Sequence, residues 1–102
     1  MKKIVNSKRY DTETATEIDS WEYGYPNDHR HVYEVLYRTA SGAYFLYGKG
    51  GPASDYAVKE GNTSWGSEDI RPLTREQSKE WLQDHDLTDA LESEFSDEII
   101  DA

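Results

Sequence analysis

Residues 31–51, HVYEVLYRTASGAYFLYGKGG, contain the element on which the rest of the fold depends. Val32–Ala40 and Ala43–Tyr47 are both rich in β-branched and aromatic residues, and Ser41-Gly42 lies between them. Two such runs joined by a short glycine-containing break are typical of a β-hairpin, because glycine adopts the positive φ that tight hairpin turns require. The sequence therefore predicts a hairpin over residues 32–47.

The expected register of this hairpin places large apolar side chains on both faces. A two-residue turn at Ser41-Gly42 would set Tyr37 opposite Leu46 on one face and Leu36 opposite Tyr47 on the other. Strands that are apolar on both faces are typical of the middle of a sheet, where both faces are covered. We therefore expect this hairpin at the centre of a small antiparallel sheet.

The composition is that of one small, aromatic-rich domain. The chain has 102 residues, of which 35% are hydrophobic, with eight tyrosines and three tryptophans. It has no cysteine, which excludes disulfides and thiolate metal sites. No secretory leader and no apolar run near the ~20 residues that span a bilayer is present in the sequence, so we expect a cytoplasmic protein.

The net charge of −10 is concentrated at one end of the chain. Residues 1–75 contain eleven acidic and ten basic residues, whereas residues 76–102 contain ten acidic residues and one basic residue, Lys79. This asymmetry argues against nucleic acid or an anionic membrane as a direct partner. It is typical of a protein that binds a basic surface, or of a merely solvated acidic segment.

The C-terminal quarter predicts helices. Residues 74–77 (TREQ) form a capping box, in which the threonine and glutamine side chains bond backbone N–H groups at a helix start. Small or apolar side chains then recur at helical spacing and predict one buried face: Ser78, Trp81, Leu82 and His85. A second helical segment is expected from about Thr88, and the last residues are expected to fray.

Together these patterns predict an α+β fold in which a small antiparallel sheet is centred on the 32–47 hairpin, with a C-terminal helix or helical pair packed on it. We expect residues 1–102 to form a single domain. Within it, 1–73 are a β-rich body, 74–96 an acidic helical segment and 97–102 a frayed tail.

Shorter runs predict the remaining strands. Lys2–Val5, Arg9–Tyr10, Thr16–Tyr23 and Glu68–Leu73 are expected strands, and the last is expected at an edge because proline cannot donate a ladder hydrogen bond. Residues 59–67 (KEGNTSWGS) are expected to form a loop. A large aromatic residue in a loop either fills a gap in the core or stays exposed for a partner, and for Trp65 we favour the first.

Several segments together resemble one known family. They are KKIVNSKRYDTETA at 2–15, Ser20-Trp21, LYRTASGAYFLYGKGGP at 36–52, Ser54 with Tyr56-Ala57, and PLTREQSKEWLQDH at 72–85. The family comprises short acidic proteins encoded by phages and conjugative elements of Gram-positive bacteria, and some members inhibit type II CRISPR nucleases. The resemblance implies a mobile-element origin and an anti-CRISPR activity in the host cell. Ser7 stands where the pattern has the glycine of an Asn-Gly turn.

No constellation of residues predicts an enzyme. His29 and His31 lie on one face of an extended segment, but only His85 remains to complete a zinc site, so a solvated loop is the favoured interpretation. Asp84 and His85 point apart on a helix, and His85 is more typical of a core histidine. No serine lies in a G-x-S-x-G setting, and residues 48–51 lack the helix and lysine of a phosphate loop. We expect no cofactor and no metal.

The acidic C-terminal quarter is the candidate partner-binding surface. Its carboxylates recur about one helical turn apart and lie off the predicted apolar faces, and each such like-charge pair costs about a few tenths of a kcal/mol. A local cost without a benefit to folding indicates a function. The candidate partner-binding residues are Glu76, Glu80, Asp84, Asp89, Glu92, Glu94, Asp97 and Glu98.

Two functions of different classes fit these observations. The first, in which the resemblance supplies the partner, is an anti-CRISPR inhibitor. Its acidic, nucleic-acid-mimicking surface would bind the basic channel of a type II CRISPR effector nuclease, or of its ribonucleoprotein, and block DNA or guide RNA engagement. The second is a non-enzymatic accessory or regulatory protein of a phage or conjugative element, with a solubilising acidic C-terminus. A small enzyme is a third, less favoured interpretation.

Overall fold

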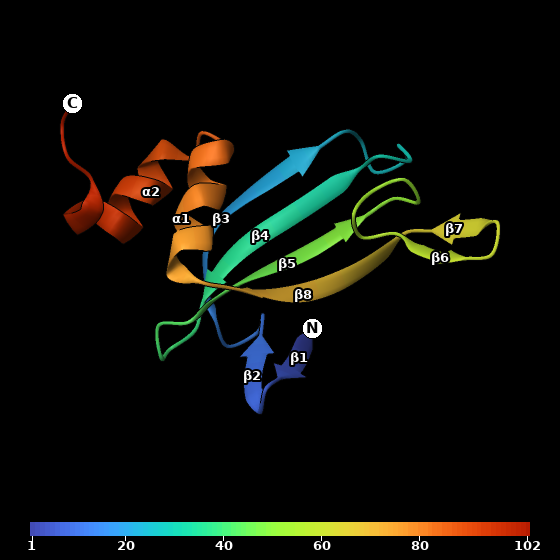
Figure 1. Cartoon of the computed structure of the whole chain (residues 1–102), viewed down its shortest axis with the longest axis horizontal. Helices are drawn as coiled ribbons and strands as arrows, with labels where there is room; N and C mark the ends of the chain where they lie inside the picture. The colour runs from blue at the N-terminus through green and yellow to red at the C-terminus, as the bar shows by residue number, and fades with distance from the viewer.

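A four-stranded antiparallel sheet carrying two C-terminal helices forms the centre of the molecule, and the α+β prediction is confirmed (Figure 1). The computed structural model describes all residues from 1 to 102. The central sheet has the order β3-β4-β5-β8, with bounds Thr16–Tyr23, Val32–Arg38, Tyr44–Gly50 and Ser67–Leu73. Two small hairpins flank it: β1 (Lys2–Val5) with β2 (Lys8–Asp11), and β6 (Val58–Glu60) with β7 (Thr63–Trp65). The chain ends with α1 (Arg75–Asp84), α2 (Thr88–Phe95) and a 3-10 turn, η1 (Ser96–Glu98).

The β4–β5 hairpin is central as predicted, but its expected register is wrong by one residue. Leu36 pairs with Leu46, because the connecting loop has three residues instead of two. The Thr39 N–H donates to the Ala43 carbonyl at 2.8 Å, and Gly42 takes φ +90°. This is a type I turn followed by a left-handed residue, the usual three-residue hairpin loop. Both faces of the hairpin remain apolar, so its central position is unaffected.

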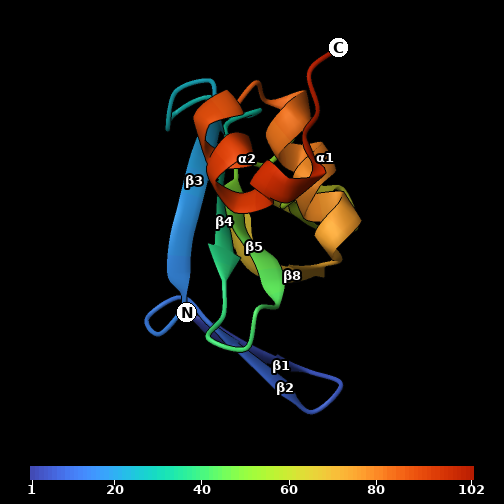
Figure 2. The same ribbon diagram turned by 90° about the vertical axis from the view of Figure 1, so that its left-hand side faces the viewer.

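The two helices cover one face of this sheet and enclose the larger core (Figure 2). Leu36, Tyr44, Leu46, Trp81, Leu82 and Phe95 are its buried members. The predicted capping box is confirmed: the Gln77 N–H donates to the Thr74 hydroxyl at 3.1 Å, and the Thr74 N–H donates to the Gln77 side-chain oxygen at 2.8 Å. It fixes the start of α1 directly after β8, so that the helix folds back over the sheet.

The β1–β2 hairpin covers only one end of the opposite sheet face. Its Tyr10 packs edge-on against Phe45, with ring centroids 5.6 Å apart, and Ile70 completes a second, smaller core. Asn6 and Ser7 both have positive φ, 51° and 63°, as a type I′ hairpin turn requires. The serine therefore occupies a position that glycine would fill with less strain.

Two predictions for residues 59–67 are wrong. This segment lies mostly in the β6–β7 hairpin, where Gly61 at φ +60° supplies the first residue of a tight turn. Trp65 pairs with Val58 and is 42% exposed, so it does not fill the core. Tyr56, 4% exposed, fills the gap instead by packing over Gly48, where an added Cβ would come within 2.0 Å of the phenol.

The position of β8 in the sheet agrees with its sequence. β8 is an edge strand, as its proline predicts, and Pro72 pairs with Phe45 of its single neighbour β5. Neither helix has the length and apolar character needed to cross a bilayer.

Candidate functional site

The predicted acidic residues of α1 lie on the solvent side of the helix. Glu76, Glu80 and Asp84 are all exposed, whereas the side of the helix that faces the sheet buries Trp81 and Leu82. The separation follows from helical geometry, because residues four apart share a face. These three carboxylates therefore form a continuous row along α1.

The acidic residues at the start of α2 are also exposed. The side chains of Asp89 and Glu92 make no hydrogen bond or ion pair within the protein. The connection between the helices adds Asp86, which is exposed and has φ +55°. This carboxylate was not among the predicted binding residues, although it lies between the two acidic helices.

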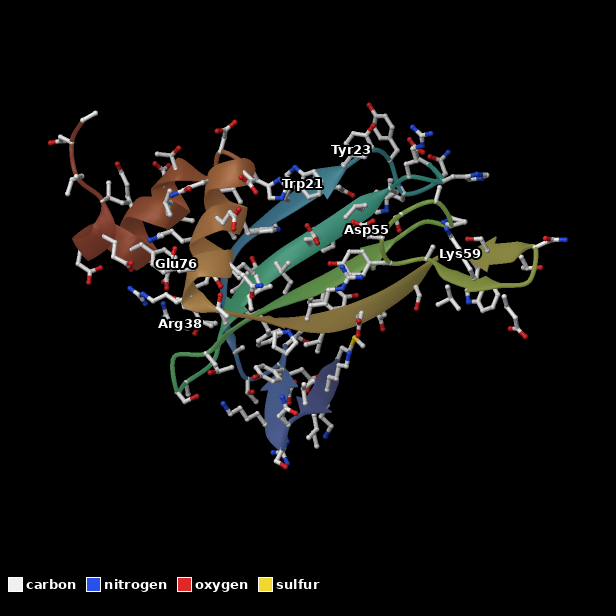
Figure 3. The ribbon with its side chains drawn as sticks, viewed as in Figure 1. Trp21, Tyr23, Arg38, Asp55, Lys59 and Glu76 are labelled. Carbon is white, nitrogen blue, oxygen red and sulfur yellow. The ribbon has the colours of Figure 1, made fainter.

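Glu94 differs from its neighbours because it is part of the internal structure. Its side chain is only 12% exposed, and it accepts hydrogen bonds from the Arg38 guanidinium and, at 2.9 Å, from the Tyr44 hydroxyl. The hydrogen bond to Glu94 and the charge of its carboxylate raise the pKa of Arg38. Arg38 lies at the end of the sheet that α2 covers (Figure 3). The prediction that Glu94 belongs to a free acidic surface is therefore wrong.

Glu98 is likewise engaged in ion pairs. It lies 2.6 Å from Arg75 and 3.3 Å from Lys79, and the hydrogen bonds from these two side chains lower its pKa. Lys79 also contacts Glu76 at 3.0 Å. Asp97 is 3.9 Å from Arg75 but its side chain stays 80% exposed. We expected residues 97–102 to fray, but residues 97 and 98 lie in η1 and form ion pairs with α1.

The free part of the acidic segment is smaller than predicted but still extensive. We call it the acidic helical surface and define it by the exposed carboxylates Glu76, Glu80, Asp84, Asp89, Glu92 and Asp97. Four of these, Glu80, Asp84, Asp89 and Glu92, have no cationic partner in the protein. A surface of this kind attracts basic groups and repels phosphates.

A polar cluster that the sequence analysis missed attaches α1 to the sheet. Glu34 accepts hydrogen bonds from the Tyr56 hydroxyl at 2.6 Å and from the Trp81 indole at 3.1 Å. The Arg71 guanidinium lies 4.0 Å from the centre of the Tyr56 ring. Burial and the bond to Glu34 raise the pKa of Tyr56. The cluster fixes the position of α1, and therefore of its acidic row, relative to β4 and β8.

The histidines are placed separately. His31 is 7% exposed and lies 2.6 Å from the Glu22 carboxylate, whereas His29 is exposed in the loop before it. His85, predicted to be a core residue, is half-buried at the end of α1 and stacks on Trp21 with ring centroids 4.0 Å apart. No group of three histidine or carboxylate side chains converges in a geometry that would hold a metal ion.

The largest cavity lies away from the acidic helical surface. It has a volume of about 530 Å³ and is bounded by Lys8, Arg9 and Tyr10 of β2 and by residues of the β4–β5 loop. It contains no carboxylate, so the basic groups that line it face solvent without a partner. The protein therefore has a locally basic end and a strongly acidic end.

Comparison of the chain with protein-family models, with curated protein sequences and with solved structures found no match.

Proposed function

We propose that this protein is a non-enzymatic inhibitor that binds the basic, nucleic-acid-binding channel of a partner protein through its acidic helical surface. The partner that we propose is a type II CRISPR effector nuclease in the host cell, and binding would block its engagement of DNA or guide RNA. The resemblance described above supports this choice of partner, and the charge distribution supports the mode of binding.

One observation carries the proposal: the fold separates acids that it needs from acids that it does not. Glu94 and Glu98 are bonded to cations and hold the helices in place. The side chains of Glu80, Asp84 and Glu92 are exposed and contribute no hydrogen bond or ion pair to the fold. Uncompensated like charges one helical turn apart are unfavourable in the free protein, and a basic partner would relieve this cost.

The proposed mechanism is competition for a surface that normally binds phosphates. A CRISPR nuclease holds its guide–target duplex in a positively charged channel, recognised through the nucleic-acid backbone. Carboxylates presented in rows on two helices would occupy the same lysine and arginine side chains. Because such charge pairs lie near the surface, their attraction is screened within ~10 Å at 0.1 M salt. Binding should therefore weaken steeply as the salt concentration rises.

The test is charge reversal on the free acids with a matched control. Glu80→Lys combined with Glu92→Lys should raise the Kd for a guide-loaded type II nuclease about tenfold or more and abolish inhibition of DNA cleavage. The control, Glu13→Lys with Glu60→Lys, makes the same change in net charge at exposed carboxylates outside the helices. Its second site adjoins Lys59, at the opposite end of the molecule from Glu76 (Figure 3).

The outcomes separate the two candidate functions. Loss of inhibition in the helical variant alone supports the proposal. Equal behaviour of both variants, or salt-independent inhibition, would contradict it. The accessory-protein alternative predicts that neither the wild type nor any variant binds the nuclease, and that helical charge reversal lowers only the solubility.

A further inference from the structure

The sheet face opposite the helices carries three tyrosines in its middle and carboxylates at both margins. Tyr33 and Tyr37 come from β4 and Tyr47 from β5, the two central strands, and all three are half-buried. We call these three residues the tyrosine face. The strand register sets Glu17 and Glu22 of β3 beside Tyr37 and Tyr33. It sets Glu68 of β8 beside Lys49, the neighbour of Tyr33 on β5.

The phenols and carboxylates of this face interact with one another. The Tyr47 hydroxyl donates to the Glu68 carboxylate at 2.5 Å, and burial together with this bond raises the pKa of Tyr47 to about 12. Burial and the charge of Glu17 raise the pKa of Tyr37. The phenols of Tyr37 and Tyr47 therefore stay protonated, and the aromatic surface keeps a rim of negative charge.

Only part of this face is covered. The β1–β2 hairpin packs at one end, over Phe45 and Ile70, and Tyr37 and Tyr47 adjoin this cluster with their half-buried rings. No helix lies on this side of the sheet. Glu17, Glu22 and Glu68 are all exposed. Lys49 is the one cation of the protein placed over a ring of the tyrosine face, 5.7 Å from the centre of Tyr33. This internal contact is the same type of interaction that an incoming cation would make.

We propose that the tyrosine face is a second docking surface, and that it binds arginine side chains of a basic segment in the partner protein. An aromatic ring face attracts a cation, and arginine also stacks on the ring through its planar guanidinium. Carboxylates at both margins accept hydrogen bonds from the same group. Tyrosine is enriched among residues that dominate binding energy at protein interfaces.

The charges on this face decide between a basic protein segment and a nucleic acid strand. Aromatic side chains on an open sheet face also stack bases, but such sites place cations along the strand to bind its phosphates. Here the margins of the uncovered part carry Glu17, Glu22 and Glu68 against the single cation Lys49. The basic residues of the β1–β2 hairpin lie at the covered end, where Lys3 is bonded to Asp69. These carboxylates repel phosphates and attract guanidinium groups. The inference rests on the proposed function in one respect, which is that the partner is a basic protein.

The test uses peptide probes, so it is independent of the identity of the nuclease. The full-length protein, labelled with ¹⁵N and with ¹³C in its tyrosine rings, is titrated with a peptide of alternating arginine and glycine. Arginine should shift the ring signals of Tyr33 and Tyr47. Tyr33→Leu should raise the Kd measured at Tyr47 about two- to fivefold, the range expected for one exposed cation–π contact. Tyr33→Phe keeps the ring and should bind as the wild type does.

Matched controls separate this site from the acidic helical surface. Tyr25→Leu changes a tyrosine that is 78% exposed in the loop after β3 and should leave the Kd at Tyr47 unchanged. The double variant Glu80→Lys with Glu92→Lys should also leave the Kd at Tyr47 nearly unchanged. Where the peptide also binds the acidic helical surface and shifts the amide signals of α1 and α2, this variant should remove those shifts. Failure of this helical variant to affect nuclease inhibition would contradict the proposed function but not the tyrosine face.

Three results would overturn the inference. The first is the absence of any shift at Tyr33 and Tyr47 while the arginine peptide is in excess. The second is an unchanged Kd for Tyr33→Leu with a native amide spectrum. The third is tighter binding at Tyr47 of a single-stranded oligonucleotide than of the peptide, which would assign the face to nucleic acid.

Discussion

Replacement of Glu94 by lysine should destabilise the protein far more than replacement of Glu92, which lies two residues earlier on α2. The Glu94 carboxylate accepts one hydrogen bond from Tyr44, a residue only 5% exposed, and one from Arg38. A bond to a charged acceptor contributes about 1.5–3 kcal/mol when buried. The Arg38 side chain is 38% exposed, so we discount its share to about 1 kcal/mol for solvent screening.

The lysine would also place a second cation beside Arg38. Together, the lost bonds and the new repulsion predict that Glu94→Lys lowers the free energy of unfolding by about 3–4 kcal/mol. Since 1 kcal/mol shifts the melting temperature of a domain of this size by roughly 4–8 °C, the expected decrease is about 12–32 °C. Glu94→Gln keeps the size of the side chain and should cost about 1–2 kcal/mol.

Urea unfolding and thermal melting at neutral pH measure both variants against Glu92→Lys. Glu92 is exposed and has no partner, so its reversal should change the stability by less than about 0.5 kcal/mol. Equal melting temperatures for Glu94→Lys and Glu92→Lys would refute the reasoning, because both carboxylates would then be surface charges. This prediction also explains why Glu94 is left out of the functional charge reversal.

Two further predictions concern the sheet. Gly48→Ala should lower the free energy of unfolding in urea by about 2–3 kcal/mol, because its Cβ would displace the buried Tyr56 ring. In a Tyr56→Ala background the same change should cost almost nothing, and additive costs would show that the ring does not depend on the glycine. The contribution of Tyr47 to the free energy of unfolding should stay constant up to about pH 10 and fall from there towards pH 12, because tyrosine ionises near pH 10 when unfolded whereas the folded pKa of Tyr47 is about 12. For Tyr47→Phe, the free energy of unfolding should fall less steeply between pH 10 and pH 12 than for the wild type. An identical slope would mean that other groups, such as lysines, cause the loss of stability.

The central hairpin could be predicted because its evidence is local. A two-sided apolar pattern around Ser41-Gly42 indicates both the element and its place in the sheet. The register could not be predicted to one residue, because a glycine with positive φ fits a two-residue loop and a three-residue loop equally well. The choice depends on whether the backbone groups of Thr39 pair with those of Ala43, which sequence composition does not determine.

The β6–β7 hairpin was missed for a different physical reason. Its strands have three residues each, and all of them are exposed. A pattern of alternating burial needs more residues and a covered face before it differs from a polar loop. The prediction that Trp65 fills the core was wrong for the same reason, because a loop near the core and a projecting hairpin have the same sequence pattern. Tyr56 fills the gap because Gly48 leaves room for its ring.

The candidate site was predicted in outline, and its errors come from long-range pairing. Spacing on a helix identifies which carboxylates avoid the apolar face, and this was correct for Glu80 and Glu92. It does not identify which of them meet a cation from a distant strand. Glu94 and its partner Arg38 are 56 residues apart, and only the packing of α2 on the sheet brings them together.

The distribution of cations links the fold to the proposed function. Lys79 is the single basic residue after position 75, and its ammonium group is bonded to Glu76 and Glu98. Arg38 and Arg75 bond Glu94 and Glu98. Each cation that reaches the helical end therefore holds α2 or η1 in place. Lys79 also neutralises Glu76, but no cation of the protein pairs with Glu80 or Asp84 in the exposed row on α1. The same side chains that make the helices stable thus leave their outer surface uncompensated, so any neutralising charge has to come from salt or from a basic partner.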